Sequence, residues 1–264
     1  GNIVWPQPPE PARIKFVRSI FTEDDIGREY SILEHLFGKS YFDGLVRPYG
    51  VSARRGNIYV ADLFLRRVVV FDLAKKRIFP VGQEGGVTMP VSAVADEAGN
   101  IYVADSGGSK VVRFDARGRY QTSFSLEGGK PVALAVNDAL GRLYVVDRGR
   151  HRVLVFGLDG AKLFSFGGVG VADGKFNIPL DIALDRTGRV HVLDNGNLRV
   201  QIFPPGGEFL RRFGAVGDGP GMFANPKGIA VDSEGHIYVT DAAFSNFQIL
   251  DDEGRVRLFV GEAG

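Results

Sequence analysis

Five aspartates recur along the chain, each at the end of an apolar segment, and four are followed five positions later by a basic residue. A carboxylate beside a cation is a pair that acid–base catalysis or ligand binding could use. Its repetition favours a structural role, in which the carboxylate accepts backbone N–H groups and the base braces a hairpin. The pairs are Asp62 with Arg67, Asp105 with Lys110, Asp147 with Arg152, and Asp194 with Arg199. The fifth aspartate, Asp241, has Asn246 in place of the base, so Asp241 is a candidate ligand-binding residue.

The four histidines and the absence of cysteine limit which metal sites and catalytic nucleophiles the chain could contain. No two histidines among His35, His151, His191 and His236 have metal-ligand spacing. His191 stands where the other copies have Tyr, and we interpret it as a packed strand residue. A chain without cysteine has no disulfide, thiolate metal site or Cys nucleophile. We therefore assign no catalytic residue, no metal ligand and no cofactor, with an axial divalent metal as the alternative.

Two residues break the regularity of the repeated units and rank first as ligand contacts. Each unit enters its first strand through Pro and two further residues, which we expect at the mouth of a central channel. The second of these is small in four units and is Asp181 in the other. The first is charged only in the next unit, where it is Lys227, and is Tyr49 in the first unit. The alternative is that Asp181 and Lys227 simply pair with each other at the rim.

Basic residues crowd one hairpin, where Arg148, Arg150 and His151 are further candidates for ligand contact, and Arg66 and Arg67 occupy the equivalent hairpin of the first unit. Such a cluster could bind nucleic acid, or it could be a solvated rim. The chain has 32 basic and 31 acidic residues and a net charge of +1, so no global field attracts a polyanion. Nucleic acid is therefore a disfavoured partner.

The elements that position these residues follow from a repeated pattern. An apolar strand containing Tyr or His ends in the recurring Asp at 58–62, 101–105, 143–147, 190–194 and 237–241. Each unit then continues through a turn, another apolar strand, a Gly-containing turn and a last strand. The spacing of 42 to 47 residues between successive aspartates is typical of four-stranded propeller blades. A β-solenoid or a pair of sandwiches is the alternative.

The predicted organisation is an all-β propeller with an N-terminal extension. The five complete blades are expected at about 48–82, 90–124, 131–166, 179–213 and 226–261, within a propeller region spanning 48–264. The extension, 1–47, contains a predicted outer strand at 12–20 and a predicted short helix at about 23–38, where Ile26, Tyr30, Leu33 and Phe37 have helical spacing. The helix is expected to cover one face of the disc.

Two segments resemble a known repeat family. Residues 147–153, Asp-Arg-Gly-Arg-His-Arg-Val, resemble the Asp-Ser-Gly-Asn-His-Arg-Val core of NHL repeats. Residues 217–223 and 226–232 are similar to the loop between blades and the first strand of that family. The resemblance extends over about 48–261 and implies a propeller of the bacterial six-bladed type. Since five copies are complete, the strand at 12–20 would belong to a sixth blade, and roughly 40 further residues are expected after Gly264.

The resemblance also widens the choice of function. Some NHL-like propellers are lyases or lactonases with an axial metal, and others bind single-stranded RNA. The function that we predict is a non-enzymatic propeller that binds a protein or small ligand through one loop face. The enzyme and the RNA-binding module are the alternatives.

The location of the protein is predicted only indirectly. No run approaches the 18 or so apolar residues that a membrane helix needs. The chain begins with Gly-Asn-Ile, which is typical of a trimmed or engineered start, and a removed signal segment is one origin of such a start. We expect an extracytoplasmic, periplasmic or secreted protein.

Overall fold

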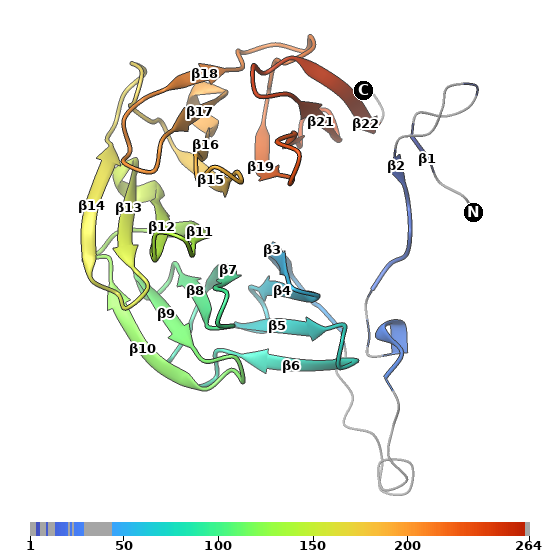
Figure 1. The fold of residues 1–264 in the computed structure, drawn as a ribbon, viewed down its shortest axis with the longest axis vertical. Helices are drawn as coiled ribbons and strands as arrows, with labels where there is room; N and C mark the ends of the chain where they lie inside the picture. The colour runs from blue at the N-terminus through green and yellow to red at the C-terminus, as the bar shows by residue number, and fades with distance from the viewer. Residues whose placement is uncertain are drawn as a thin grey trace, which may run out of the picture.

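Five four-stranded antiparallel sheets are arranged around an axis as the blades of a propeller in the computed structural model (Figure 1). The structure describes residues 4–5, 9, 14–20, 22, 24–28 and 44–261. The blades are, in chain order, β3 (Pro48–Arg54), β4 (Asn57–Asp62), β5 (Arg67–Asp72) and β6 (Arg77–Val81); β7 (Pro90–Ala95), β8 (Ile101–Asp105), β9 (Lys110–Phe114) and β10 (Tyr120–Ser125); β11 (Pro131–Asn137), β12 (Arg142–Asp147), β13 (Arg152–Gly157) and β14 (Lys162–Gly167); β15 (Pro179–Leu184), β16 (Val190–Asp194), β17 (Arg199–Phe203) and β18 (Arg211–Phe213); and β19 (Pro226–Val231), β20 (Ile237–Asp241), β21 (Asn246–Leu250) and β22 (Val256–Gly261). The predicted fold class is confirmed.

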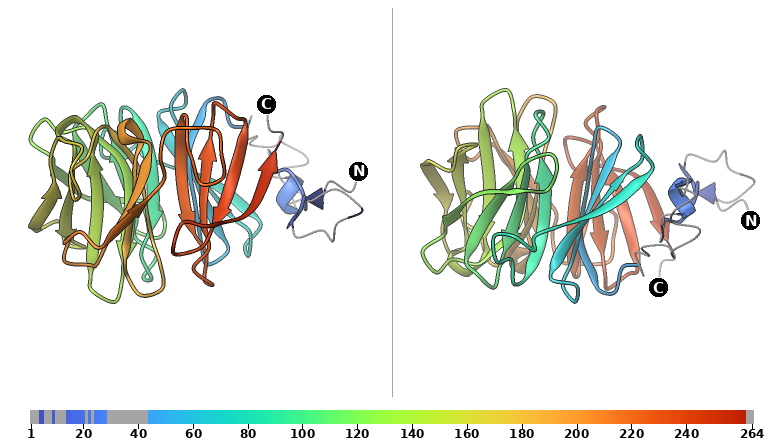
Figure 2. Two further views of the ribbon diagram at one scale, coloured as in Figure 1. Left: turned by 90° about the horizontal axis from the view of Figure 1, so that it is seen from above. Right: turned by 90° about the horizontal axis from the view of Figure 1, so that it is seen from below.

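Within each blade the chain runs from the axis outward. The first strands, β3, β7, β11, β15 and β19, lie innermost and contact one another in sequence, while the fourth strands form the rim (Figure 1). The Pro that begins each first strand lies opposite the Asp that ends the second strand. The loop that leads into a blade and the turn between its second and third strands therefore share one face of the disc, which we call the upper face. Figure 2 shows the disc from its sides.

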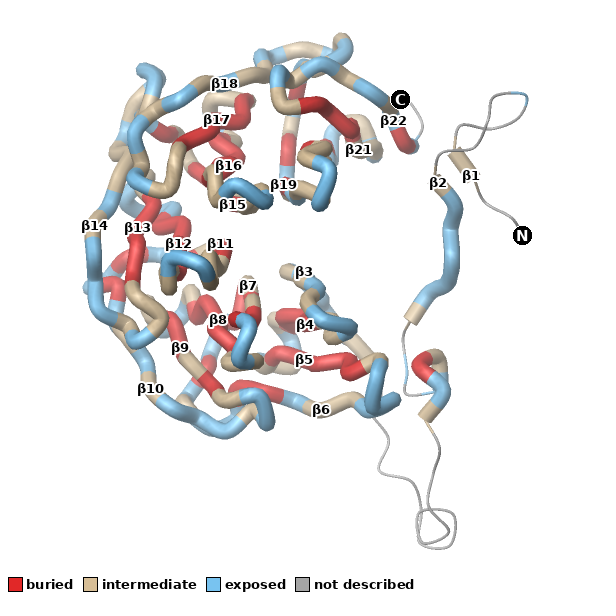
Figure 3. Tube along the Cα trace, in the orientation of Figure 1, coloured by how far each residue is buried: buried red, intermediate tan, exposed pale blue. Residues whose placement is uncertain are grey.

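The core consists of apolar layers between neighbouring blades. Tyr59 of the first blade and Val103 of the second share one cluster, and Tyr144 of the third and Val190 of the fourth share another. Full burial of each large apolar side chain contributes about 1.5–3 kcal/mol, and the second and third strands carry most of it (Figure 3). A single blade exposes both faces of its sheet, so the ring arrangement is what buries them.

The turn between the second and third strands has the same backbone geometry in all five blades. The last residue of this turn has a backbone φ between 49° and 52°, in the left-handed region that residues other than Gly rarely adopt. In the third and fourth blades the turn includes the short 3-10 segments η2 (Arg148–Arg150) and η3 (Asn195–Asn197). The five residues in this conformation are Arg66, Ser109, His151, Leu198 and Ser245.

The N-terminal extension lies beside the gap between the fifth and first blades (Figure 1). Among the described residues of the predicted outer strand, 14–20, only β2 (Ile14–Lys15) is a strand, and it pairs with β1 (Val4–Trp5). These strands fit a partial extra blade, beside the five complete ones. Of the predicted helix, the described residues contain only the 3-10 turn η1 (Asp24–Ile26), and the segment 29–43 lies outside the described residues.

Side chains of the extension pack on the first blade. Ile26 is 6% exposed and belongs to a cluster with Val60, Val69 and Phe71, against which Ile20 also packs. The extension therefore covers the face of the first blade that borders the gap. In the described part of the chain, no helix has the length and apolar character needed to cross a membrane.

Candidate functional site

A cavity of about 640 Å³ lies on the axis and is lined mainly by the five first strands. The residues that follow the Pro of each first strand meet there, as the sequence predicts, except that Ala133 does not line it. The lining residues from these positions are Tyr49, Gly50, Val91, Ser92, Val132, Leu180, Asp181, Lys227 and Gly228. One short dipeptide from each blade thus supplies most of the cavity wall.

A β-bulge in each blade explains why these side chains reach the axis. The pairing of the first and second strands shifts register immediately after the Pro, so the next residue is left without a partner across the ladder. Bulges re-aim side chains and are frequent beside binding sites. The unpaired residues are Tyr49, Val91, Val132, Leu180 and Lys227.

The repeated aspartates hold the loops that lead into the blades. All five are at most 1% exposed, and each accepts backbone N–H groups from the loop before its own first strand. Asp62, for example, accepts from Val46, Arg47, Phe64 and Leu65. Burial by itself would raise the pKa of Asp62, but these N–H groups hold it below its ordinary value.

The predicted ion pairs of these aspartates form in only two blades. Arg152 Nε lies 3.2 Å from Asp147, and Arg199 Nε lies 2.8 Å from Asp194. The prediction is wrong for the second blade, where Lys110 donates to the carbonyl oxygens of Gly85 and Gly86. Arg67 likewise makes no described ion pair with Asp62, whose two oxygens already accept four backbone N–H groups.

Asp181 is the one carboxylate among the described residues that line the cavity. Its Oδ1 accepts from the N–H of Ile182 at 2.9 Å, and its Oδ2 accepts from the N–H of Ile229 at 2.8 Å. Burial raises the pKa of Asp181 to about 6, although the two N–H groups act in the opposite direction. Asp181 therefore links the fourth blade to the first strand of the fifth, and no ion pair with Lys227 is present among the described contacts.

The other predicted ligand residues divide into two groups. Arg148 and Tyr49 line the cavity together with Asp181 and Lys227. The remaining three form hydrogen bonds within the loops. Arg150 donates to the carbonyl oxygens of Leu126 and Glu127, and His151 Nδ1 accepts from the backbone N–H of Ile178. Asp241 accepts from the backbone N–H groups of Ala224, Asn225 and Ala243. Whether any of the seven binds a ligand stays a prediction.

Sequence reasoning missed several residues of the cavity. Asn195 follows the repeated Asp of the fourth blade, as Arg148 does in the third, so the position after that Asp was a usable signal. Tyr238 and Thr240 line the cavity from β20, which borders the gap. The equivalent Tyr102 and Tyr144 are fully buried between blades, whereas Tyr238 is only half-buried. Tyr238 differs from Tyr102 and Tyr144 only in that its blade borders the gap.

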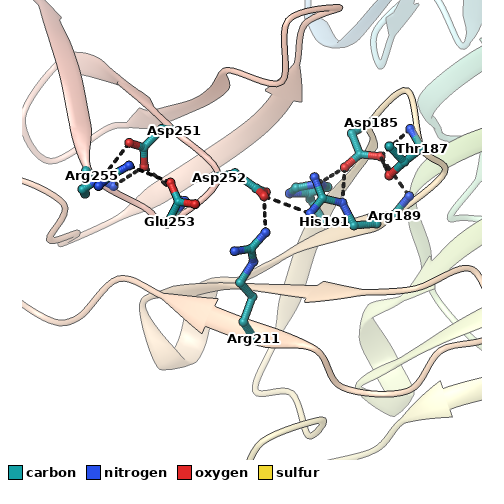
Figure 4. Close-up of polar contacts among 9 residues, drawn as sticks. All are labelled: Asp185, Thr187, Arg189, His191, Arg211, Asp251, Asp252, Glu253 and Arg255. Carbon is teal, nitrogen blue, oxygen red and sulfur yellow. Dashed lines mark hydrogen bonds and ion pairs between the residues drawn. The ribbon is translucent and has the colours of Figure 1, made fainter.

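His191 belongs to a polar network between the fourth and fifth blades (Figure 4). His191 is 1% exposed, and its Nε2 lies 3.2 Å from Asp185 Oδ2. Burial lowers the pKa of His191, and hydrogen bonding to Asp185 offsets this only in part. Arg189 joins Asp185 to Asp252 at 2.6 and 2.9 Å. The packed-residue interpretation of His191 agrees with this environment, and the described residues contain no group of three potential metal ligands.

The lower face carries the turns between first and second strands. Arg54 of the first blade donates to Asp138 of the third and to the carbonyl oxygen of Ala95 in the second. The backbone N–H of Glu97 also donates to Asp138. Ionic contacts therefore tie three blades together at the end of the axis opposite the upper face.

Comparisons with known proteins agree with this architecture. The NHL repeat family model matches residues 129–156, 176–203 and 223–250. No curated protein sequence matches the chain significantly. Among solved structures, virginiamycin B lyase from Staphylococcus aureus is similar at 12% identity, with a TM-score of 0.66 over 83% of this chain and 71% of that chain.

Two further solved structures are similar. A streptogramin B lyase has 15% identity and a TM-score of 0.66 over 82% of this chain and 69% of its own. A chain of a nidogen/laminin complex has 14% identity and a TM-score of 0.67 over 81% of this chain and 80% of its own. At such identities the likeness concerns the fold alone. The family matches and the five meandering blades together identify the chain as an NHL-repeat β-propeller.

Proposed function

We propose that this propeller is a non-enzymatic binding protein that takes a small ligand into the axial cavity through the upper face. The observation that carries the proposal is the cavity itself, to which the five blades contribute residues from equivalent positions. Its volume of about 640 Å³ lies within the range of about 300–1,000 Å³ found for small-molecule sites. Binding of a partner protein at the same face is the alternative, because the mouth of the cavity faces solvent.

The composition of the wall supports a small ligand. Apolar side chains, among them Val51, Val132 and Leu180, form much of it, and a few polar groups are interspersed. Val51 and Tyr49 are 74% and 59% exposed, so apolar surface is available to a ligand at the first blade. Apolar walls with few placed polar groups are the usual composition of a ligand pocket.

Val51→Trp provides the test, because the larger side chain occupies the cavity that the ligand would enter. A library of small molecules is screened by ligand-observed NMR against the unchanged protein, and hits are retested on the variant. Val171→Trp is the matched control, since Val171 is 75% exposed and lies outside the cavity. We expect most hits to lose binding in Val51→Trp and to keep it in Val171→Trp. Hits that bind both variants equally would sink the proposal.

The metal-dependent lyase or lactonase and the RNA-binding module remain predictions from the sequence, as does the extracytoplasmic location. The lyases among the similar structures share the fold at 12–15% identity and carry no argument about this chain's chemistry.

A further inference from the structure

The mouth of the cavity on the upper face carries cations and no carboxylate side chains other than those already engaged. Three positions of each blade surround the mouth: the residue before the Pro, the residue after it, and the residue after the repeated Asp. None of these positions holds Asp or Glu in any blade. Four of them hold a cation, namely Arg47, Lys130, Arg148 and Lys227.

The lower face carries charges of both signs. Its turns between first and second strands hold the carboxylates Asp96, Glu97, Asp138, Asp185, Asp232 and Glu234, and Arg55, Arg186 and Arg189 lie among them. Because the net charge of the chain is only +1, the positive mouth does not result from an overall basic excess. It results from the residues that stand at the three positions around the mouth.

Arg148 and Lys227 are the two cations that line the cavity. In the part of the chain that the structure describes, neither side chain has a hydrogen bond or ion pair. They differ in this from Arg150 and Arg199, which donate to loop carbonyl oxygens, and from Arg152, which donates to the carboxylate of Asp147. An unpaired cation at the rim of a pocket is an available partner for an anion.

Asp181 does not neutralise this pair of cations directly. Both of its oxygens already accept backbone N–H groups, one from each of two neighbouring blades. It therefore acts as a strut between blades within the wall, and the two cations retain their capacity for an external anion.

We infer that the ligand of the axial cavity is a small organic anion, with an apolar body against the Val51 and Tyr49 side of the mouth and an anionic head group bound by Arg148 and Lys227. This inference rests on the proposed function and adds the chemical class of the ligand. Cations and exposed apolar side chains come from different blades, so a ligand that spans the mouth meets both.

Two fluorescent probes of nearly identical shape test the inference. Anilinonaphthalene sulfonate is an aromatic anion, and phenylnaphthylamine is the same skeleton without the sulfonate. The dissociation constant of each is measured by fluorescence titration for the unchanged protein and for Lys227→Gln, Arg148→Gln, Val51→Trp and the control Lys162→Gln. Lys162 begins the outer strand β14 and lies outside the cavity.

We expect the sulfonate probe to bind more tightly than the neutral one. Loss of one cation should weaken the sulfonate probe by about three- to tenfold and leave the neutral probe unchanged. Lys162→Gln should leave both unchanged, and circular dichroism checks that every variant is folded. Equal or tighter binding of the neutral probe, or charge variants that bind the sulfonate as the unchanged protein does, would overturn the inference.

The same titrations separate the two proposals. If Val51→Trp weakens both probes but the charge variants do not matter, the cavity binds ligands and the anion inference fails. If Val51→Trp weakens neither probe, binding occurs elsewhere and the proposed function fails with it.

Discussion

At the residue scale, neighbouring side chains of one cavity wall have different roles. Lys227 and Arg148 line the cavity without a partner among the described residues, while Asp181 accepts one N–H group from its own blade and one from the next. The charged side chain of Asp181 therefore joins two blades, whereas those of Lys227 and Arg148 are available to bind a ligand. Regularity of the repeat made these exceptions visible in the sequence, but it did not reveal which of them is structural.

Asp181→Asn should make the stability of the fold less dependent on pH between pH 4 and pH 7. Asn has one acceptor oxygen for the two N–H groups that Asp181 binds, so the pH dependence is compared and not the absolute stability. Burial raises the folded-state pKa of Asp181 to about 6, so the carboxylate destabilises the folded state above that pH, and this penalty disappears as the pH falls below its unfolded value of 3.8. One pKa unit corresponds to about 1.4 kcal/mol, and screening by cavity water reduces the effect. We therefore expect the unchanged protein to lose about 1–2 kcal/mol through this group between pH 4 and pH 7, and the variant, which lacks the titration, not to lose it.

Urea unfolding of Asp181→Asn at pH 4 and pH 7 measures this difference. Asp218→Asn is the control, because Asp218 is exposed and lies outside the cavity. An Asp181→Asn variant whose stability changes between pH 4 and pH 7 as much as that of the unchanged protein would contradict the prediction.

At the element scale, the hairpin that ends in Asp is the unit that assembles the upper face. Proline, Asp and the left-handed turn recur in every blade, so strand positions and the approach of the bulged residues to the axis followed from the sequence. The partners of the bases did not, because Lys110 has loop carbonyl oxygens within reach and uses them in preference to Asp105. Of the helix predicted around Ile26, the described residues contain one 3-10 turn, and the rest stays a prediction.

Asp194→Ala should destabilise the fold more than Asp147→Ala. Arg199 has a side chain that is 4% exposed, whereas that of Arg152 is 23% exposed. Removing Asp194 takes the nearer counterion, at 2.8 Å, from a buried guanidinium and leaves Asp173 at 3.9 Å. This should cost about 3–5 kcal/mol, while removing Asp147 should cost about 1–3 kcal/mol.

Chemical denaturation of both variants tests this order, and the double variant Asp194→Ala, Arg199→Ala is the companion measurement. We expect the second substitution to recover part of the lost stability, because it removes a buried charge that has lost its nearer counterion. Equal losses in Asp194→Ala and Asp147→Ala would show that burial of the base is irrelevant.

At the scale of the whole molecule, five blades and a partial extra one surround the axis. The gap beside the fifth blade leaves Tyr238 half-buried and lets it line the cavity, whereas its equivalents are enclosed by a following blade. This is why Tyr238 and Thr240 were missed: their local sequence matches that of enclosed blades, and only the assembled ring shows which blade has a free side.

Ile26→Ala should destabilise the propeller although Ile26 lies outside the blades. Its side chain packs on Val60, Val69 and Phe71, and truncating a buried Ile typically costs about 2–4 kcal/mol. Val17→Ala is the control, because Val17 belongs to the same extension and is 84% exposed. Urea unfolding should show a lower midpoint only for Ile26→Ala, and two unaffected variants would mean that the extension does not stabilise the first blade.

The attachment of each repeated aspartate to the backbone of its own incoming loop has an evolutionary consequence. The repeated aspartates bind backbone N–H groups, which every residue except Pro has. The residues beside these contacts can therefore be substituted without loss of the hydrogen bonds. Val132 and Lys227 occupy one such equivalent position, and Arg148 and Asn195 another. Duplication or exchange of blades would therefore produce new combinations of residues at the mouth of the cavity while the backbone arrangement of the blades stays the same.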